Sequence, residues 1–262
     1  MPWNRGPHKR KFIRIRGTYV AQTADAQIKD AVLGFWGEWE PQSTAMAIAA
    51  PLPGGPAWIH EPFYSPPADN SWRQNTDPCV FGGFRYTCCQ QHVKRRPTGM
   101  QRLESGSMIL FGSYVADRFV LDTVFVIGKG DRAGAVAGVE HDSTTFRRLR
   151  GVVPAAYLDV TLEPWYSEDP AEPCRLYDGA TVDAPIDGMY SFFPCLPWTD
   201  GRNGFARPHL DLPGVMTQSQ RQGRRVSVVT ERVISSLWAE VGAQVVSQGL
   251  QLGVSAEMPP RR

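Results

Sequence analysis

A tryptophan and two carboxylates share one side of the segment Phe35–Glu40. If this segment is a strand, its period of two places Trp36, Glu38 and Glu40 on one face and Trp39 on the other. A tryptophan ring gives a stacking surface worth about 1–3 kcal/mol per base, and a carboxylate can accept from the exocyclic amine of cytosine. Together they suit a pocket for an extruded base. The alternative is structural, with Trp39 in the core, Trp36 packed under a loop and the carboxylates in solvent.

A single carboxylate, Asp122, lies inside the strongly apolar segment Phe119–Ile127. A buried carboxylate without a partner is costly, so it requires an arginine, backbone donors or a ligand. Arg85, Arg118 and Arg207 are the candidate partners. Asp122 is therefore either the polar floor of a pocket or half of a buried ion pair.

Two adjacent glycines, Gly82 and Gly83, precede the aromatic and basic run Phe84–Tyr86. Glycine lets a ligand or another backbone approach closely, and nucleic-acid surfaces often interleave stacking and charged side chains. With the two regions above, this run completes the predicted ligand-binding residues, which are Trp36, Glu38, Trp39, Arg85, Tyr86, Asp122 and Arg207.

Arginine is concentrated in short basic clusters, although the net charge is only +2. Guanidinium groups match phosphate geometry and stack on bases. We predict that a nucleic-acid backbone contacts Arg14, Arg16, Arg95, Arg96, Arg147, Arg148, Arg224 and Arg225. The alternative is that these clusters are solvated loops and tails, as charge runs usually are.

The spacings of well-known catalytic motifs are missing. The chain has no G-x-x-x-x-G-K-[ST] phosphate loop, no G-x-G-x-x-G that opens a helix and no G-x-S-x-G nucleophile elbow. The zinc-deaminase pattern fails because His60 and Glu61 are adjacent and no C-x-x-C pair occurs. We therefore predict no catalytic residue, no metal site and no cofactor. An enzyme would have to use Asp122, Glu38, His60 or His141 in a cleft.

The cysteines and the N-terminus indicate a cytoplasmic protein. The five cysteines are odd in number and two are adjacent, which favours reduced and mostly buried thiols. The basic residues 1–16 are not followed by the apolar segment of a signal peptide. No apolar run approaches the ~20 residues of a membrane span. We expect a soluble protein without membrane contact.

Most of the chain is predicted to be β-structure. Apolar runs between Gly- and Pro-containing turns predict strands at 12–20, 31–40, 80–90, 106–113, 118–127, 155–162 and 189–196, with 204–212 extended. Residues 41–78 are predicted as a long irregular loop, either functional or packed on the surface. A short helix is predicted at 144–150.

One amphipathic helix is predicted late in the chain. Apolar residues recur at three- and four-residue spacing over Val226–Gln248, and Gly249 ends the pattern. The predicted fold is α+β and mostly β, a curved sheet or small β-barrel with one long C-terminal amphipathic helix and long loops. We predict a basic flexible arm, a single globular domain and a tail, at 1–11, 12–254 and 255–262.

The segment Ser105–Ile127 reads SGSMILFGSYVADRFVLDTVFVI. It resembles the G-D-x-V-L-F-Y segment, and the strand after it, of EVE and ASCH domains in the PUA-like superfamily. The matching residues are Gly106, Ile109, Leu110 and Phe111. Ser107 replaces the family's aspartate, and Gly112 replaces its aromatic residue. The resemblance implies a small β-barrel whose cleft holds a nucleotide or modified base, often in prokaryotic modification or defence systems. The motif is a scaffold motif, so no family site residue is transferred.

The leading hypothesis is a nucleic-acid or nucleotide-binding module that reads a flipped or modified base. One alternative is an enzyme that acts on a nucleotide-like small molecule. Another is a structural adaptor subunit, in which the amphipathic helix docks a protein partner through Trp238. The same helix can instead pack on its own sheet, as most such helices do.

Overall fold

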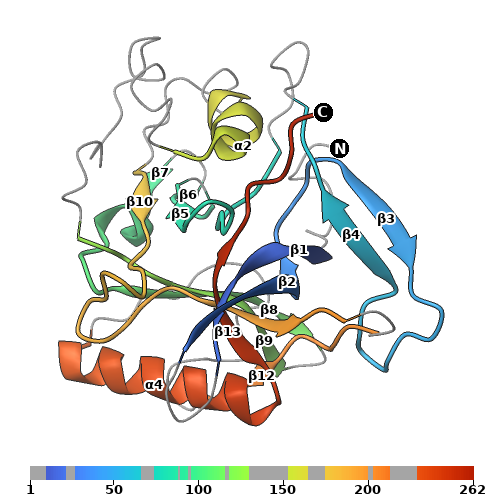
Figure 1. The fold of residues 1–262 in the computed structure, drawn as a ribbon. Helices are drawn as coiled ribbons and strands as arrows, with labels where there is room; N and C mark the ends of the chain where they lie inside the picture. The colour runs from blue at the N-terminus through green and yellow to red at the C-terminus, as the bar shows by residue number, and fades with distance from the viewer. Residues whose placement is uncertain are drawn as a thin grey trace.

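Strands form most of the elements in the computed structural model (Figure 1). This confirms the mostly β, α+β fold class. The residues that the structure describes are 10–21, 27–65, 74–87, 89–93, 96–115, 118–129, 153–164, 175–199, 203–212 and 229–262.

Four strands close into a small barrel, as predicted. They are β1 (Lys11–Val20), β2 (Ile28–Gly37), β11 (Phe193–Pro197) and β13 (Gln251–Ala256). Each pairs antiparallel with the next, and β13 returns to β1. Glycines permit the close approach of the strands, because a Cβ at Gly17 would lie 2.3 Å from the carbonyl oxygen of Ser255. Phe35 and Phe193 are fully buried, with ring centroids 4.3 Å apart.

A hairpin extends the sheet beyond the barrel. The first half of β1 pairs parallel with β4 (Trp58–Pro62), and β4 pairs antiparallel with β3 (Ser43–Ala47) at the sheet edge. Figure 1 shows this hairpin projecting from the rest of the molecule. The irregular loop predicted at 41–78 is therefore wrong for these residues. Its many prolines obscured two short strands, and residues 66–73 lie outside the described chain.

A second sheet has the order β12–β9–β8, with β8 at Met108–Val115, β9 at Arg118–Val126 and β12 at His209–Leu210. The register of β8 and β9 shifts so that Asp122 has no partner on β8 and forms a bulge. Gly112 faces this bulge, where a Cβ would lie 2.2 Å from the carbonyl oxygen of Val120. The strand pair that the EVE/ASCH resemblance places in a barrel thus lies in a separate sheet.

The predicted amphipathic helix is α4, Glu231–Ser247, which has 17 residues. It is shorter than the predicted helix and is not the last element, because β13 follows it. Val241 and Val245 are fully buried, and Figure 1 shows α4 lying below the sheets. Trp238 packs within the molecule, since its Nε1 donates to the carbonyl of Tyr190 over 2.9 Å.

Shorter elements complete the described chain. They are β5 (Arg85–Tyr86), β6 (His92–Val93), β7 (Arg96–Pro97), η1 (Gly99–Arg102), α2 (Ala155–Tyr157), η2 (Leu158–Leu162) and β10 (Tyr177–Asp178). The long strand predicted at 80–90 is reduced to β5. The short helix predicted at 144–150 lies outside the described residues.

The strand predicted at 155–162 is wrong, because this segment forms the helical turns α2 and η2. Six of its eight residues are buried, so its hydrophobic pattern carries no clear period. Two hydroxyl groups tie these helical turns to residues 74–77. Tyr157 donates to Oδ1 of Asp77 over 2.6 Å, and Thr161 donates to the carbonyl of Gln74 over 2.7 Å.

The two ends of the described chain are held by the fold. Arg10 makes buried ion pairs, and residues 1–9 lie outside the described chain. The segment predicted as a tail at 255–262 includes the end of β13, and Arg262 donates its backbone N–H to the carbonyl of Tyr64 over 2.9 Å. Among the described residues, no helix has the length and apolarity to cross a membrane.

Candidate functional site

Four of the predicted ligand-binding residues come together. Glu38, Asp122 and Arg207 meet with Arg10 in what we call the charge cluster, and Trp36 lies beside it. Nε of Arg10 is 2.7 Å from Oδ2 of Asp122, and Nη1 of Arg10 forms an ion pair with Glu38. Nη1 of Arg207 is 3.3 Å from Oδ1 of Asp122. Asp122 is the residue of β9 that the bulge leaves without a partner on β8.

The charge cluster is buried and internally balanced. The side chains of Glu38 and Asp122 are each 2% exposed, against 15% for Arg10 and 18% for Arg207. Two carboxylates oppose two guanidinium groups, so the cluster needs no ligand to neutralise it. Of the two interpretations of Asp122, the geometry matches the buried ion pair.

Contacts within the protein also cover the ring of Trp36. Its Nε1 donates to the carbonyl of Phe205 over 2.7 Å, and Phe12 packs edge-on against it with centroids 5.5 Å apart. The guanidinium carbon of Arg207 lies 5.9 Å from the ring centroid. These contacts leave Trp36 as part of the packing around the charge cluster.

The other three predicted ligand residues make internal contacts. Trp39 is 1% exposed and donates its Nε1 to the carbonyl of Gln42. Tyr86 is fully buried and stacks on Tyr177. Nε of Arg85 is 2.6 Å from Oδ1 of Asp178. None of the three lines the depression described next.

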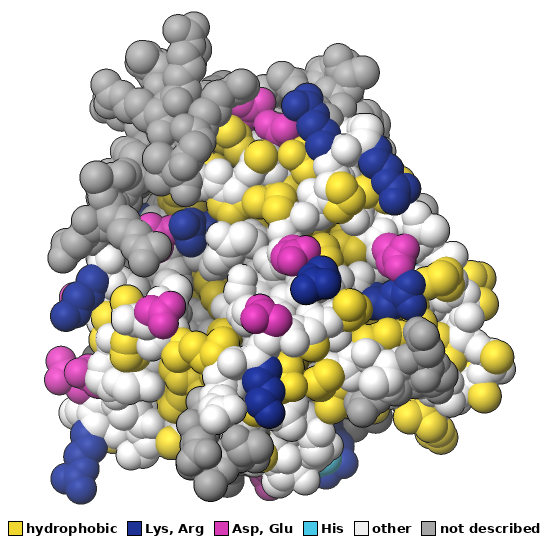
Figure 2. All heavy atoms as spheres, in the orientation of Figure 1, with side chains coloured by type: hydrophobic (Ala, Val, Ile, Leu, Met, Phe, Trp, Pro, Cys, Tyr) yellow, Lys and Arg dark blue, Asp and Glu magenta, His cyan; other side chains and the backbone are white. Residues whose placement is uncertain are grey.

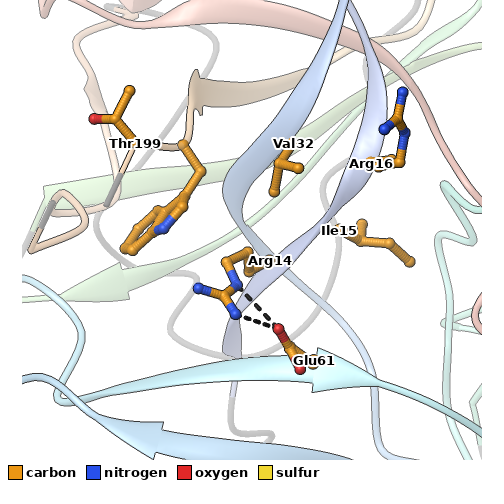
Figure 3. Close-up of a pocket in the computed structure, with 7 residues that line it drawn as sticks. Arg14, Ile15, Arg16, Val32, Glu61 and Thr199 are labelled. Atoms are coloured by element: carbon orange, nitrogen blue, oxygen red, sulfur yellow. Dashed lines mark hydrogen bonds and ion pairs between the residues drawn. The ribbon is translucent and has the colours of Figure 1, made fainter. Parts of the chain in front are cut away.

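An open depression of about 620 Å³ lies over β1 and β2 (Figure 3). We call it the arginine depression. Its volume is in the range typical of small-molecule sites. The lining residues are Arg14, Ile15, Arg16, Val32, Glu61, Trp198 and Thr199.

The two arginines of the depression differ in how they are held. Arg14 pairs with Glu61 of β4, at 3.1 Å from its Nε to Oε1, and Figure 3 shows the two side chains pointing toward one another. Arg16 makes a looser contact with Glu257, 3.4 Å long, and the side chains of this pair are 66% and 60% exposed. Arg16 is therefore accessible to a solvent-borne anion, whereas Arg14 is pre-positioned.

Trp198 is the aromatic residue of the depression, and sequence reasoning missed it. Its ring packs against Phe12, with centroids 6.0 Å apart, and over Gly34. Its indole N–H is buried and has no hydrogen-bond partner among the described residues. Trp36, Trp39 and Trp238, in contrast, each donate to a backbone carbonyl. The only signal in the sequence was its place just after the strand predicted at 189–196.

The groups named for an enzyme do not converge in one pocket. Nδ1 of His60 is 2.9 Å from Oγ of Ser43 on the hairpin, whereas Glu38 and Asp122 belong to the charge cluster. Burial and the nearby Lys11 lower the pKa of His60. Burial also lowers the pKa of Lys11 to about 8. His141 lies outside the described residues.

Three of the arginines predicted to contact a nucleic-acid backbone are described. Arg14 and Arg16 line the depression, and Arg96 is exposed on β7. The others lie outside the described residues and are Arg95, Arg147, Arg148, Arg224 and Arg225.

Metal-ligating and thiol groups are dispersed in the described chain. Its His, Cys, Asp and Glu side chains form no group of three suited to a metal ion. Cys79 and Cys195 are free and buried, and burial raises the pKa of the Cys79 thiol to about 12. A thiol with such a pKa is a poor nucleophile at neutral pH.

Comparisons with protein-family models, with curated proteins and with solved structures found no match to this chain. The functional argument therefore depends on the arginine depression and its chemistry.

Proposed function

We propose that this protein binds single-stranded nucleic acid, or a nucleotide, in the arginine depression. The observation that carries the proposal is that Arg14, Arg16 and Trp198 line one open depression of small-molecule size. Cationic forks beside an aromatic ring are the combination that binds a phosphate next to a base.

The phosphate is assigned to the two arginines. Arg16 is exposed and can exchange its loose contact with Glu257 for a phosphate oxygen. Arg14 is oriented by Glu61, so less side-chain entropy is lost when it binds. Contacts of this kind release counterions, which makes binding depend steeply on salt.

The base is assigned to Trp198 and Glu61. An indole ring can stack on any base, and a carboxylate can accept from an exocyclic amine. This is the chemistry that the sequence suggested for Trp36 and Glu38, located instead in an open depression where Trp198 and Glu61 are partly exposed. A base in a duplex presents its ring face only at an end or when extruded, so a single strand or a flipped base fits best.

The finer features of the proposal come from the sequence. A flipped or modified base, and a prokaryotic modification or defence system, are what the resemblance of Ser105–Ile127 to EVE and ASCH domains implies, although that segment does not line the depression. Buried, unpaired thiols at Cys79 and Cys195 agree with a reducing compartment such as the cytoplasm.

The test is the fluorescence anisotropy of labelled single-stranded DNA, single-stranded RNA and duplex DNA, titrated at several salt concentrations. We expect the double variant Arg14→Ala/Arg16→Ala to bind single strands at least tenfold more weakly than the wild type. The slope of log affinity against log salt should become shallower by about 0.7 for each phosphate that the variant no longer neutralises. Arg232→Ala is the matched control, because Arg232 is exposed on α4 and does not line the depression.

Two results would overturn the proposal. One is a wild-type protein that binds no single strand, nucleotide or duplex at low ionic strength. The other is binding that is unchanged in the double variant. An affinity that does not vary with salt would exclude the phosphate role of the arginines specifically.

A further inference from the structure

The outer edge of β3 carries backbone groups that no described strand covers. β3 ends the six-stranded sheet and pairs only with β4. The flanking bonds run from Phe63 N–H to the carbonyl of Gln42 and from Ile48 N–H to the carbonyl of Ala57. Backbone groups of an antiparallel strand alternate in direction. Residues 42, 44, 46 and 48 therefore bond to β4, while Ser43, Ala45 and Ala47 direct their N–H and C=O groups outwards.

The side chains along this edge do not obstruct a second strand. Ser43, Ala45 and Ala47 are all small, and both alanines are exposed. Proteins usually protect a free edge with lysine, proline or a bulge. β3 has none of these over Ser43–Ala47, and its register with β4 is continuous.

Most of the hairpin is apolar, and its one charged residue, Glu61, lies on the inner strand β4. Residues 43–59 include no Asp, Glu, Lys or Arg. Several large side chains are solvent-exposed, by 52% for Trp58, 48% for Leu52 and 36% for Met46. Figure 2 shows hydrophobic side chains gathered at the right-hand margin, over this hairpin. Exposed apolar surface beside an open sheet edge is typical of an interaction site.

We propose that this edge pairs with the same edge of a second copy of the chain, forming a dimer through antiparallel β3 strands. A two-fold axis at Ala45 would place Ala45 opposite its symmetry mate and Ser43 opposite Ala47. Closed two-fold pairing is the commonest form of self-association. Like charges directly opposite one another destabilise a strand pair, and residues 43–59 carry no charge that self-pairing would bring together. Recognition of a charged partner, such as nucleic acid, has no basis on this uncharged surface.

The dimer would join two sheets into one continuous sheet. The two-fold axis of an antiparallel strand pair is perpendicular to the sheet, so both arginine depressions would open on the same side. If the proposed function holds, one nucleic-acid strand could occupy both sites. The dimer itself does not depend on that function, because β3 does not line the depression.

The experiment uses a charge at the symmetry axis. Ala45→Lys and Ala45→Asp each place like charges opposite one another in the dimer, and the side chain is solvent-exposed, so both variants should fold. Sedimentation equilibrium of the wild type should show a monomer–dimer equilibrium. Each variant should raise the dimer dissociation constant at least tenfold, and an equimolar mixture of the two should restore dimerisation. Ala49→Lys, exposed on the same hairpin outside β3, should leave the equilibrium nearly unchanged.

The mixture is the decisive arm, because only pairing of position 45 with itself predicts rescue by opposite charges. Far-ultraviolet circular dichroism of each variant checks that the sheet is intact. The proposal is overturned by a wild type that stays monomeric at every accessible concentration, or by a mixture that stays monomeric. It is also overturned if the monomer binds neutral lipid vesicles through Trp58 and Leu52, since the apolar hairpin would then serve a membrane surface.

Discussion

The charge cluster and the arginine depression use the same residue types to different ends. Each joins arginine, a carboxylate and a tryptophan, and Phe12 packs against both Trp36 and Trp198. In the cluster the carboxylates are buried and each guanidinium is paired. In the depression the side chain of Arg16 is 66% exposed, and that of Glu61 is 41% exposed although it pairs with Arg14. Charged and aromatic residues that lie together are therefore a candidate binding site only where their side chains remain exposed. Where they are buried and paired with one another, they are part of the structure.

The largest difference expected between the two regions is in stability. Asp122→Asn would leave Arg10 and Arg207 without their shared carboxylate in a buried site. Removing one partner of a buried pair costs about 3–5 kcal/mol. We expect urea denaturation to show a loss of about 3 kcal/mol in the free energy of unfolding.

The matched change on the exposed side is Glu257→Gln. Glu257 is largely exposed and contacts Arg16 at 3.4 Å. Exposed pairs contribute at most about 1 kcal/mol, so this variant should lose less than about 0.5 kcal/mol. Equal losses in the two variants would contradict the contrast between a closed cluster and an open depression.

The two tryptophans give a second, smaller contrast. Trp36→Phe removes the donor to the Phe205 carbonyl, whereas Trp198→Phe removes an N–H that has no partner among the described residues. An acceptor left without its donor costs about 1–3 kcal/mol when buried. We expect Trp36→Phe to lose about 2 kcal/mol of unfolding free energy and Trp198→Phe less than about 1 kcal/mol.

The two variants should rank in the opposite order when the affinity for single strands is measured. Single-strand affinity should fall in Trp198→Phe, because phenylalanine gives a smaller stacking surface. It should be retained in folded Trp36→Phe. A loss of affinity only in Trp36→Phe would contradict a site at Trp198 and would favour the site at Trp36 that the sequence suggested.

The smallest effect concerns Lys11, which lies on β1 between Arg10 and Arg14. Burial lowers its pKa from 10.5 to about 8. Between these values the unfolded chain holds the proton that the native protein has lost, so the free energy of unfolding rises with pH over this window. Because Lys11 is partly exposed, we expect a rise of about 1 kcal/mol. Lys11→Met should flatten the dependence of the unfolding free energy on pH over this window. An identical slope in the variant and the wild type would contradict the lowered pKa of Lys11.

Local sequence pattern predicted the long strands well. The alternation at 12–20 and the apolar run at 118–127 correspond to β1 and β9. β1 shows a period of two, whereas β9 is a nearly continuous apolar run rich in β-branched and aromatic residues, which is typical of a strand buried on both faces. Local pattern failed at α2 and η2, where burial on all sides erased the period. It also failed for β3 and β4, five-residue strands joined by a proline-rich loop.

For the candidate site, the sequence named Arg14 and Arg16 but not Trp198 or Glu61. The alternation of β1 was enough to place the two arginines on one face. Glu61 on β4 and Trp198, the residue after β11, reach them through long-range strand pairing, which one sequence does not specify.

The sequence by itself determined the composition of both regions, the mostly β fold class and the uncharged character of residues 43–59. These follow from residue type and short-range periodicity. Only the tertiary structure decided that Asp122 is neutralised by Arg10 and Arg207, whereas Arg16 stays exposed. The reason is physical, because desolvation and ion pairing depend on which strands pair. The register of β1 with β2 brings Arg10 near Glu38, and the register of β9 with β12 brings Asp122 near Arg207.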